Sequence, residues 1–145
     1  MAKVDLAALE RLAPTLDNVD NRKLDELPFG LIQLDRSGRI LRFNRAEGEL
    51  ARKDPTKQIG RSFFDEVAPC TKVREFYGRF VDGLATRKLH ETFAFNFKFA
   101  FGPQEVAVSM FYSQATDSVW VTVSRDPDAV AAAKAQARGP WGKAG

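Results

Sequence analysis

The sequence predicts an α+β domain, in which a five-stranded antiparallel sheet has helices packed on one face and an N-terminal helical cap. Short apolar runs over 29–34 and 40–43, and runs of alternating apolar and polar residues within 93–123, are typical of strands. Between these runs the apolar residues recur at helical spacing. With 145 residues, 44% of them hydrophobic and 28% charged, the chain is long enough for one globular core.

Three parts are expected along the chain: an N-terminal cap over 1–27, a core over 28–125 and a tail or linker over 126–145. Leucines at positions 6, 9, 12 and 16 recur at helical spacing and Pro14 interrupts them, so the cap should contain short helices. The last segment is rich in alanine and then in glycine, proline and lysine, which favours a frayed helix or a linker.

The first two strands are expected over 29–34 and 40–43. Asp35 and Gly38 belong to a turn cluster between them, so the two strands should pair as a β-hairpin. Asn44, with Glu47 three residues later, has the spacing of a helix capping box. The helix that begins there should end before Asp54 and Pro55.

Two further helices are expected, over 62–67 and over 73–85, joined by a non-helical connection at 68–71. The longer one is amphipathic, with apolar residues at 73, 76, 77, 80, 81 and 84. A strand with five alternating phenylalanines follows over 93–101, and Gly102-Pro103 is expected to turn the chain. Alternating runs over 106–110 and 119–123 complete the sheet.

Composition excludes several classes of protein. No apolar run approaches the roughly 20 residues of a membrane span, and the N-terminus has no apolar signal-peptide region, so a cytoplasmic protein is expected. The net charge is +3 and the basic residues are scattered, which argues against nucleic-acid binding. Cys70 is the only cysteine and His90 the only histidine. The chain therefore cannot form a disulfide within itself, and it has few of the side chains that bind zinc.

Cys70 is the first candidate for chemistry, because it follows Pro69 in a predicted loop just before a helix. A thiol near a helix N-terminus can have a lowered pKa and act as a nucleophile or an attachment point. The alternative is a buried small apolar residue, which is the usual role of a free cysteine.

Glu47 is the second candidate, because it follows a strand expected in the core and lies between the small residues Ala46 and Gly48. A carboxyl buried there would have a raised pKa and could donate a hydrogen bond or a proton. From the spacing alone, the alternative that Glu47 caps its own helix at Asn44 is favoured.

The phenylalanines over 93–101 are the third candidate, because a strand points all five rings to one face. Such a face is more often plain core, but it could also form a dry wall for a flat aromatic ligand. His90 is expected to face solvent, and Arg52 with Lys53 to form a solvated helix end.

Three stretches of the chain, FGLIQLDRSGRILRFNRAEG, KDPTKQIGRSFFDEVAPCT and EFYGRF, resemble in their order and spacing the photoactive yellow protein family. The similarity runs without a gap from about Leu24 to Arg125, and its VAPCT and NRAEG elements are specific. The resemblance implies a PAS fold and a blue-light receptor, and no enzymatic activity is expected.

The resemblance also implies a cofactor, a p-coumaroyl (4-hydroxycinnamoyl) group joined to Cys70 as a thioester. Its phenolate would lie beside Glu47, which stays protonated and gives up its proton after light isomerises the double bond. The buried carboxylate then loosens the N-terminal cap. The further residues expected to line the chromophore are Phe43, Ile32, Ala51, Lys53, Phe63, Val67, Ala68, Pro69, Thr71, Phe97, Phe99 and Phe101.

The chain departs from the family at five of these or neighbouring positions. By the resemblance, Phe43 stands where the family has a tyrosine that is the second donor to the phenolate, and Ala51 where a threonine supports that tyrosine. Lys53 replaces an arginine that shields the chromophore, Arg52 replaces a glycine, and Phe101 replaces a methionine implicated in thermal recovery. Because one donor of two is lost, we expect a raised chromophore pKa and more of the protonated form, which absorbs in the near ultraviolet.

An alternative stays open: a PAS sensor or interaction module that has lost or replaced the chromophore, with Cys70 as a leftover thiol. A cysteine enzyme is disfavoured, because the spacing indicates no general base near Cys70. The chain is expected to be a monomer or a weak dimer, and its downstream signalling partner is not indicated by the sequence.

Overall fold

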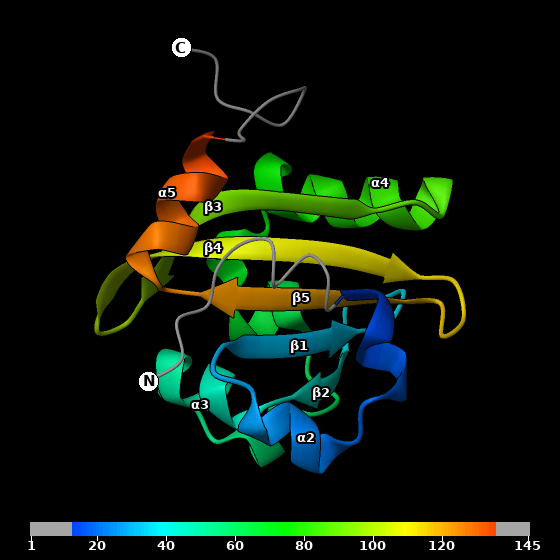
Figure 1. The fold of residues 1–145 in the computed structure, drawn as a ribbon, viewed down its shortest axis with the longest axis horizontal. Coiled ribbons are helices and arrows are strands. Elements are labelled where there is room, and N and C mark those ends of the chain that lie inside the picture. The colour runs from blue at the N-terminus through cyan, green and yellow to red at the C-terminus, as the bar shows by residue number, and fades with distance from the viewer. Residues whose placement is uncertain (1–12, 136–145) are drawn as a thin grey trace.

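The computed structural model describes residues 13–135 and confirms the predicted five-stranded antiparallel sheet. The strand order is β2-β1-β5-β4-β3, so β2 and β3 form the two edges (Figure 1). Each strand pairs with its neighbour in antiparallel register. The strands are β1 (Gly30–Leu34), β2 (Ile40–Phe43), β3 (His90–Phe99), β4 (Gly102–Ser113) and β5 (Ser118–Ser124).

The hairpin between β1 and β2 forms where the turn cluster predicts it. Asp35 Oδ1 accepts hydrogen bonds from the backbone N–H groups of Ser37 and Arg39, at 2.9 Å each. Gly38 has a φ of +85°, a backbone conformation that residues with a side chain rarely adopt. The polar side chain and the glycine together therefore close the turn.

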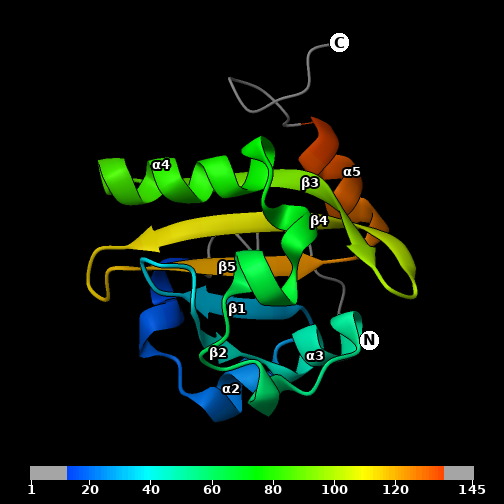
Figure 2. The ribbon, with the colours of Figure 1, turned by 180° about the vertical axis from the view of Figure 1, so that it is seen from behind.

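Most helical segments cover one face of the sheet, the face that Figure 2 shows in front. Apolar side chains of these segments and of the sheet form one cluster, the main core, which includes Ile32, Phe43, Phe76 and Phe97. The segments are α3 (Arg45–Ala51), η2 (Pro55–Lys57), η3 (Phe63–Val67), η4 (Pro69–Thr71), η5 (Arg74–Gly78) and α4 (Arg79–Thr86).

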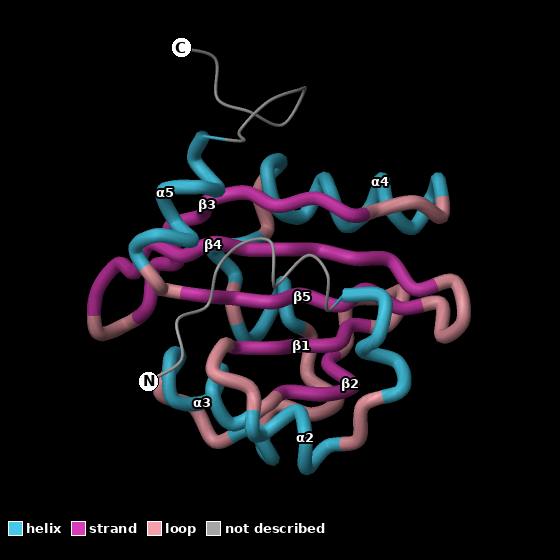
Figure 3. The backbone as a smooth tube through the Cα atoms, viewed as in Figure 1, coloured by secondary structure: helices cyan, strands magenta, loops and turns pink. Residues whose placement is uncertain are grey.

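The opposite face of the sheet has its own cover, which Figure 3 shows in front of the strands. It consists of η1 (Ala13–Asn18) and α2 (Asn21–Glu26) from the cap, and of α5 (Pro127–Ala135). A second core forms there, built from cap, sheet and α5 residues such as Leu16, Trp120 and Ala133. Asp17 in η1 fastens the cap, because its carboxylate accepts hydrogen bonds from Trp120 Nε1 (2.8 Å) and from the Ser113 hydroxyl.

Three local predictions are corrected by the structure. Gly102 and Pro103 do not form the turn but begin β4, because Phe99 pairs with Gly102 and the turn lies at residues 100–101. The connection over 68–71 contains a 3₁₀ turn, Pro69–Thr71, rather than being non-helical.

The predicted amphipathic helix begins as a π-turn, Arg74–Gly78, before α4 continues it. A π-turn shifts the helical period. Of the expected apolar residues, Val73 and Val81 are exposed, while Phe76, Phe80 and Leu84 are buried.

Some predictions fall outside the described residues, namely the leucines at positions 6, 9 and 12 and the tail over 136–145. Within 13–135, no helix is long and apolar enough to cross a membrane.

Candidate functional site

Glu47 is held at the start of α3 by the side chain of Asn44. Asn44 Oδ1 accepts from the backbone N–H of Glu47 (3.0 Å) and of Leu31 (2.9 Å), so it both begins the helix and fixes it to β1. The backbone N–H of Asn44 donates to the Leu31 carbonyl. The expectation that the Glu47 carboxyl caps its own helix is therefore wrong, because the group that it would cap already has a partner.

The Glu47 carboxyl is instead buried, and one of its oxygen atoms lacks a hydrogen-bond partner among the described residues. The residue is 3% exposed, and among the described residues its Oε1 atom has no hydrogen-bond partner. Removal from water disfavours the charged form, and burial raises the pKa of Glu47 from 4.5 to about 8. The carboxyl is therefore mostly protonated at neutral pH.

Gly30 of β1 provides the space for this carboxyl. A Cβ atom built on Gly30 would overlap Glu47 Oε1. By strand alternation Gly30 faces the same side as Ile32 and Leu34, which belong to the main core. The carboxyl consequently lies on the side of the sheet that the main core occupies.

Cys70 lies in the turn Pro69–Thr71, between the helical segments η3 and η5. The turn is fixed by the buried Thr71, whose hydroxyl donates to the Ala68 carbonyl at 2.7 Å. The thiol is half-buried, packs against the main core, and accepts from the Lys98 backbone N–H at 3.4 Å. Cys70 is thus neither fully buried nor freely exposed, and it is held beside β3 between the positions of Phe97 and Phe99.

The phenylalanines of β3 form an aromatic wall with Phe76 of η5. Phe76 contacts Phe93, Phe95 and Phe97 edge to face, with ring centroids 5.1–6.1 Å apart. Phe99 stacks on Phe97, and Phe101 stacks on Phe99 from the turn that follows β3. All five rings of the sequence pattern therefore belong to one continuous set, although Phe101 lies outside the strand and is 41% exposed.

The main core brings most of the expected site residues together. Ile32, Phe43, Phe63, Val67, Ala68 and Phe97 are members of it, and Cys70 and Phe99 pack against it. Ala51 and Thr71 are buried as well, whereas Pro69 is exposed and Lys53 is half-buried.

Arg52 and Lys53 form the end of α3 as expected, with Arg52 exposed and Lys53 half-buried. The Arg52 guanidinium lies over the Phe101 ring, 4.0 Å from its centroid. In the described part of the chain, the Lys53 ammonium has no ring contact or ion pair.

Sequence reasoning missed two residues of the site, Gly30 and the full role of Asn44. The side-chain amide of Asn44 donates to the carbonyls of Leu24 (2.8 Å) and Phe29 (3.1 Å), so one residue joins the Glu47 helix to the cap. The sequence predicted only that Asn44 caps α3. Its hydrogen bonds to Leu24, Phe29 and Leu31 could not be predicted, because these residues are more than ten positions away along the chain.

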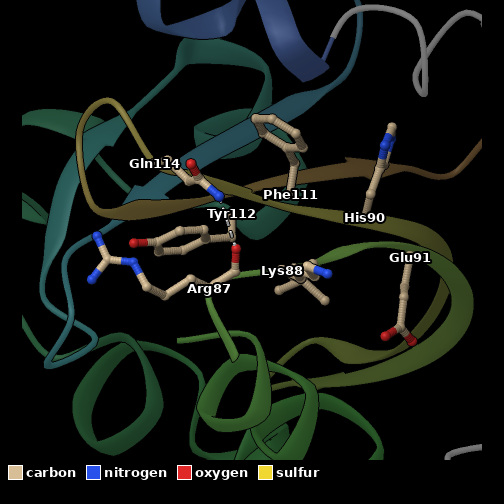
Figure 4. Close-up of a pocket in the computed structure, with 8 residues that line it drawn as sticks. Arg87, Lys88, His90, Glu91, Phe111, Tyr112 and Gln114 are labelled. Carbon is tan, nitrogen blue, oxygen red and sulfur yellow. Dashed lines mark hydrogen bonds between the residues drawn. The ribbon is translucent and has the colours of Figure 1, made fainter. Parts of the chain in front are cut away.

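The structure also has an open groove of about 590 Å³, which contains none of the expected site residues. It lies where α4 leads into β3, and Figure 4 shows Arg87, Tyr112 and Gln114 gathered on one side and His90 beside Phe111 on the other. Gln114 donates to the Arg87 carbonyl at 3.3 Å, and His90 contacts the Phe111 ring edge to face. The groove therefore offers surface side chains but no buried unpaired polar group.

The fold and sequence match a known class of domain. Residues 24–132 match the family model described as the PAS fold. This match and the five-stranded sheet with its helical cover define the chain as a PAS domain.

Similar proteins of known family show which kind of PAS domain the chain is. The chain is 42% identical over 111 residues to a photoactive yellow protein of Halochromatium salexigens, covering 77% of this chain and 89% of the relative. It is also 42% identical over 108 residues to that of Rhodothalassium salexigens, covering 74% and 86%. The photoactive yellow protein domain of the sensor histidine kinase Ppr from Rhodospirillum centenum superposes with a TM-score of 0.72 at 42% identity, covering 75% of this chain and 96% of that domain.

The chain belongs to the photoactive yellow protein family. It is accordingly a PAS photoreceptor module and not an enzyme, as the sequence predicted.

Proposed function

We propose that the chain is a blue-light receptor that carries a p-coumaroyl group as a thioester on Cys70. The observation that carries the proposal is the buried Glu47 carboxyl, whose Oε1 has no partner among the described residues. A buried polar atom without a partner is costly, and a phenolate oxygen of a bound chromophore would accept its proton in a hydrogen bond. The only cysteine of the chain and the aromatic wall supply the other two requirements, a point of attachment and a flat apolar surface.

The residues present fit such a group. When bound, the p-coumaroyl group would supply visible-light absorption and a photoisomerisable double bond. Cys70 Sγ would hold the thioester. The walls would come from Phe43, Ile32, Ala51, Lys53, Phe63, Val67, Ala68, Pro69, Thr71, Phe97, Phe99 and Phe101.

Glu47 would act as the proton donor of the photocycle. Its raised pKa keeps the carboxyl protonated in the dark at neutral pH. Loss of the proton would leave a carboxylate in the core, where an unpaired charge is unfavourable. Because Asn44 binds both the Glu47 helix and the Leu24 carbonyl, strain at Glu47 would be transmitted to the cap, and a loosened cap would be the signal.

The receptor would act in the cytoplasm, as a monomer or a weak dimer, on a downstream signalling protein that the proposal leaves unspecified.

The experiment is to add activated p-coumarate to the apoprotein and to record the intact mass and the absorption spectrum. We expect a mass increase of one coumaroyl group and an absorption band that bleaches and recovers under blue light. Cys70→Ala should show neither change. Adduct formation on Cys70→Ala would contradict the proposed attachment.

A second function is favoured by one observation: Phe43 is buried in the main core without the hydroxyl that its family counterpart would offer a phenolate. A chain with such a pocket could serve as a PAS module that holds another flat ligand or none. No adduct, or an adduct that does not respond to light, would support this alternative over the photoreceptor.

A further inference from the structure

Four aromatic rings and one guanidinium form a continuous column from the core to the surface. Phe76 contacts Phe97 edge to face, and Phe97, Phe99 and Phe101 then stack nearly parallel, with centroids 5.3 and 4.9 Å apart. The Arg52 guanidinium covers the outermost ring at 4.0 Å. Phe97 is 1% exposed and Phe101 is 41% exposed, so the column leads from the main core to solvent.

The column connects the helix that carries Glu47 with the strand that contacts Cys70. Arg52 ends α3, the helix that carries Glu47. Phe101 ends the turn after β3, the strand whose Lys98 N–H binds the Cys70 thiol. The contact between Arg52 and Phe101 therefore closes the outer end of the wall against which Cys70 is held.

Arg52 occupies a backbone conformation that is unfavourable for a residue with a side chain. Its φ and ψ are 56° and 49°, in the left-handed region where glycine is the usual residue after a helix. A strained non-glycine residue that persists at a site is a reason to look for a role of its side chain. Among the described residues, its side chain has this ring contact with Phe101 and no hydrogen bond or ion pair.

We propose that Arg52 and Phe101 form a clasp that controls access to Cys70. The clasp opens when the guanidinium leaves the ring, and it then lets small molecules and water reach the thiol along the aromatic wall. It deepens the proposed function, on which its biological role rests, because the same clasp would shield a thioester on Cys70 from solvent. Lys53, the residue expected from the family resemblance to cover the site, is not part of it.

The test is the rate at which iodoacetamide alkylates Cys70 in the full-length apoprotein. The chain has only one cysteine, so each labelled molecule reports on this thiol. A cation–π contact at an exposed site is weak, so its loss should accelerate labelling by about two- to five-fold in Arg52→Gly. Phe101→Leu should accelerate it to a similar degree. The double variant should be no faster than the faster single variant, because both changes open the same contact.

Arg87→Gly is the matched control for the backbone change. Arg87 also follows a helix in the left-handed region, with a φ of 58°, and no ring contact to its guanidinium occurs among the described residues. Both glycine variants relieve strain, so neither should lower the melting temperature, and only Arg52→Gly should change the labelling rate. Labelling of Arg52→Gly at the wild-type rate, or rate increases that multiply in the double variant, would overturn the clasp.

A second readout uses the loaded protein. If the p-coumaroyl adduct forms, hydroxylamine should cleave its thioester faster in Arg52→Gly and in Phe101→Leu than in the wild type. If no adduct forms, the proposed function fails while the labelling of the apoprotein still decides whether the clasp exists. An adduct whose cleavage and labelling rates are the same in all variants would reject the clasp and leave the proposed function in place.

Discussion

At the scale of single residues, the site depends on a carboxyl that is kept away from water. Among the described residues no donor reaches Glu47 Oε1, and the missing side chain of Gly30 leaves room for the carboxyl. The position of Phe43, paired with Ile32 across the first hairpin, adds an apolar ring where a hydroxyl could have bound an anion. Both features favour neutral over charged groups in this region.

The first prediction concerns the pH dependence of the stability of the apoprotein. The pKa of Glu47 is about 8 in the folded chain and near 4.5 when unfolded. Between these values the unfolded state releases a proton that the folded state keeps, so stability should fall as pH rises from 4.5 to 8. The full effect is on the order of 5 kcal/mol. Urea unfolding of Glu47→Gln at a series of pH values should lack this decline.

Glu49→Gln is the control for this prediction, because Glu49 lies on the same helix but is exposed. Its unfolding free energy should follow that of the wild type at each pH. Equal pH profiles for the wild type and Glu47→Gln would show that the folded protein ionises Glu47 at ordinary pH.

The second prediction concerns Phe43→Tyr in the loaded protein. The new hydroxyl should donate to the phenolate, and a hydrogen bond to a charged group contributes roughly 1.5–3 kcal/mol, or about 1–2 pKa units. The near-ultraviolet band of the protonated chromophore should therefore lose intensity at neutral pH, and the band of the anionic form should gain intensity and move to shorter wavelength. A spectrophotometric titration measures both changes. A titration curve that does not move would mean that Phe43 faces away from the chromophore.

At the scale of elements, α3 is joined to the cap by a hydrogen bond from the Asn44 side chain to the Leu24 carbonyl and by one contact from its neighbour Arg45. Of the four hydrogen bonds of the Asn44 side chain, two hold α3 to its own start and to β1, and two reach back to Leu24 and Phe29. Asp25 adds to the connection by accepting from the Arg45 backbone N–H at 2.9 Å. The helix that carries Glu47, the proposed proton donor, is thereby connected to the cap, the element that is proposed to loosen.

Asn44→Asp should separate these two functions of Asn44. An aspartate keeps the oxygen that caps α3 but has no N–H for the Leu24 carbonyl. At about 1 kcal/mol for the lost hydrogen bond to Leu24, the cap should open roughly five-fold more often. Trypsin cleavage at the exposed Arg22 and Lys23 measures this opening.

Cleavage at Arg87 and Lys88, at the far end of α4, is the internal control for the Asn44 variant. Their cleavage rate should stay near that of the wild type. A rise of the same size at both places would indicate general destabilisation and would contradict a specific role of Asn44 in holding the cap.

Local patterns predicted the elements better than their contacts. The strands could be predicted because the alternation of apolar and polar residues follows directly from strand geometry. Asn44 could be predicted as a helix cap because the backbone N–H that it binds, that of Glu47, is only three residues away. The π-turn at 74–78 and the start of β4 at Gly102 were missed, because tertiary packing decides them. Contacts between distant segments, such as that of Arg52 with Phe101, cannot be predicted from the spacing of residues along the chain.

At the scale of the whole molecule, the sheet separates two cores that face opposite ways. The main core holds the candidate site, and the second core joins the cap to α5 through residues such as Leu31 and Trp120 of the sheet. The sequence indicated only a frayed helix or a linker after residue 125, because the alanines of this segment lack a strong apolar stripe. Ala129 and Ala133 nevertheless pack into the second core, 1% and 0% exposed.

The structure predicts that α5 stabilises the domain through this packing. Ala133→Asp would place an unpaired charge in the second core and should lower the free energy of unfolding by roughly 2–4 kcal/mol. Ala131→Asp places the same charge on the same helix at an exposed position, and should change it by less than about 0.5 kcal/mol. Urea unfolding followed by far-ultraviolet circular dichroism measures both. If the two variants are equally stable, the packing of α5 does not contribute to the stability of the domain; a lower free energy of unfolding for Ala133→Asp alone means that it does.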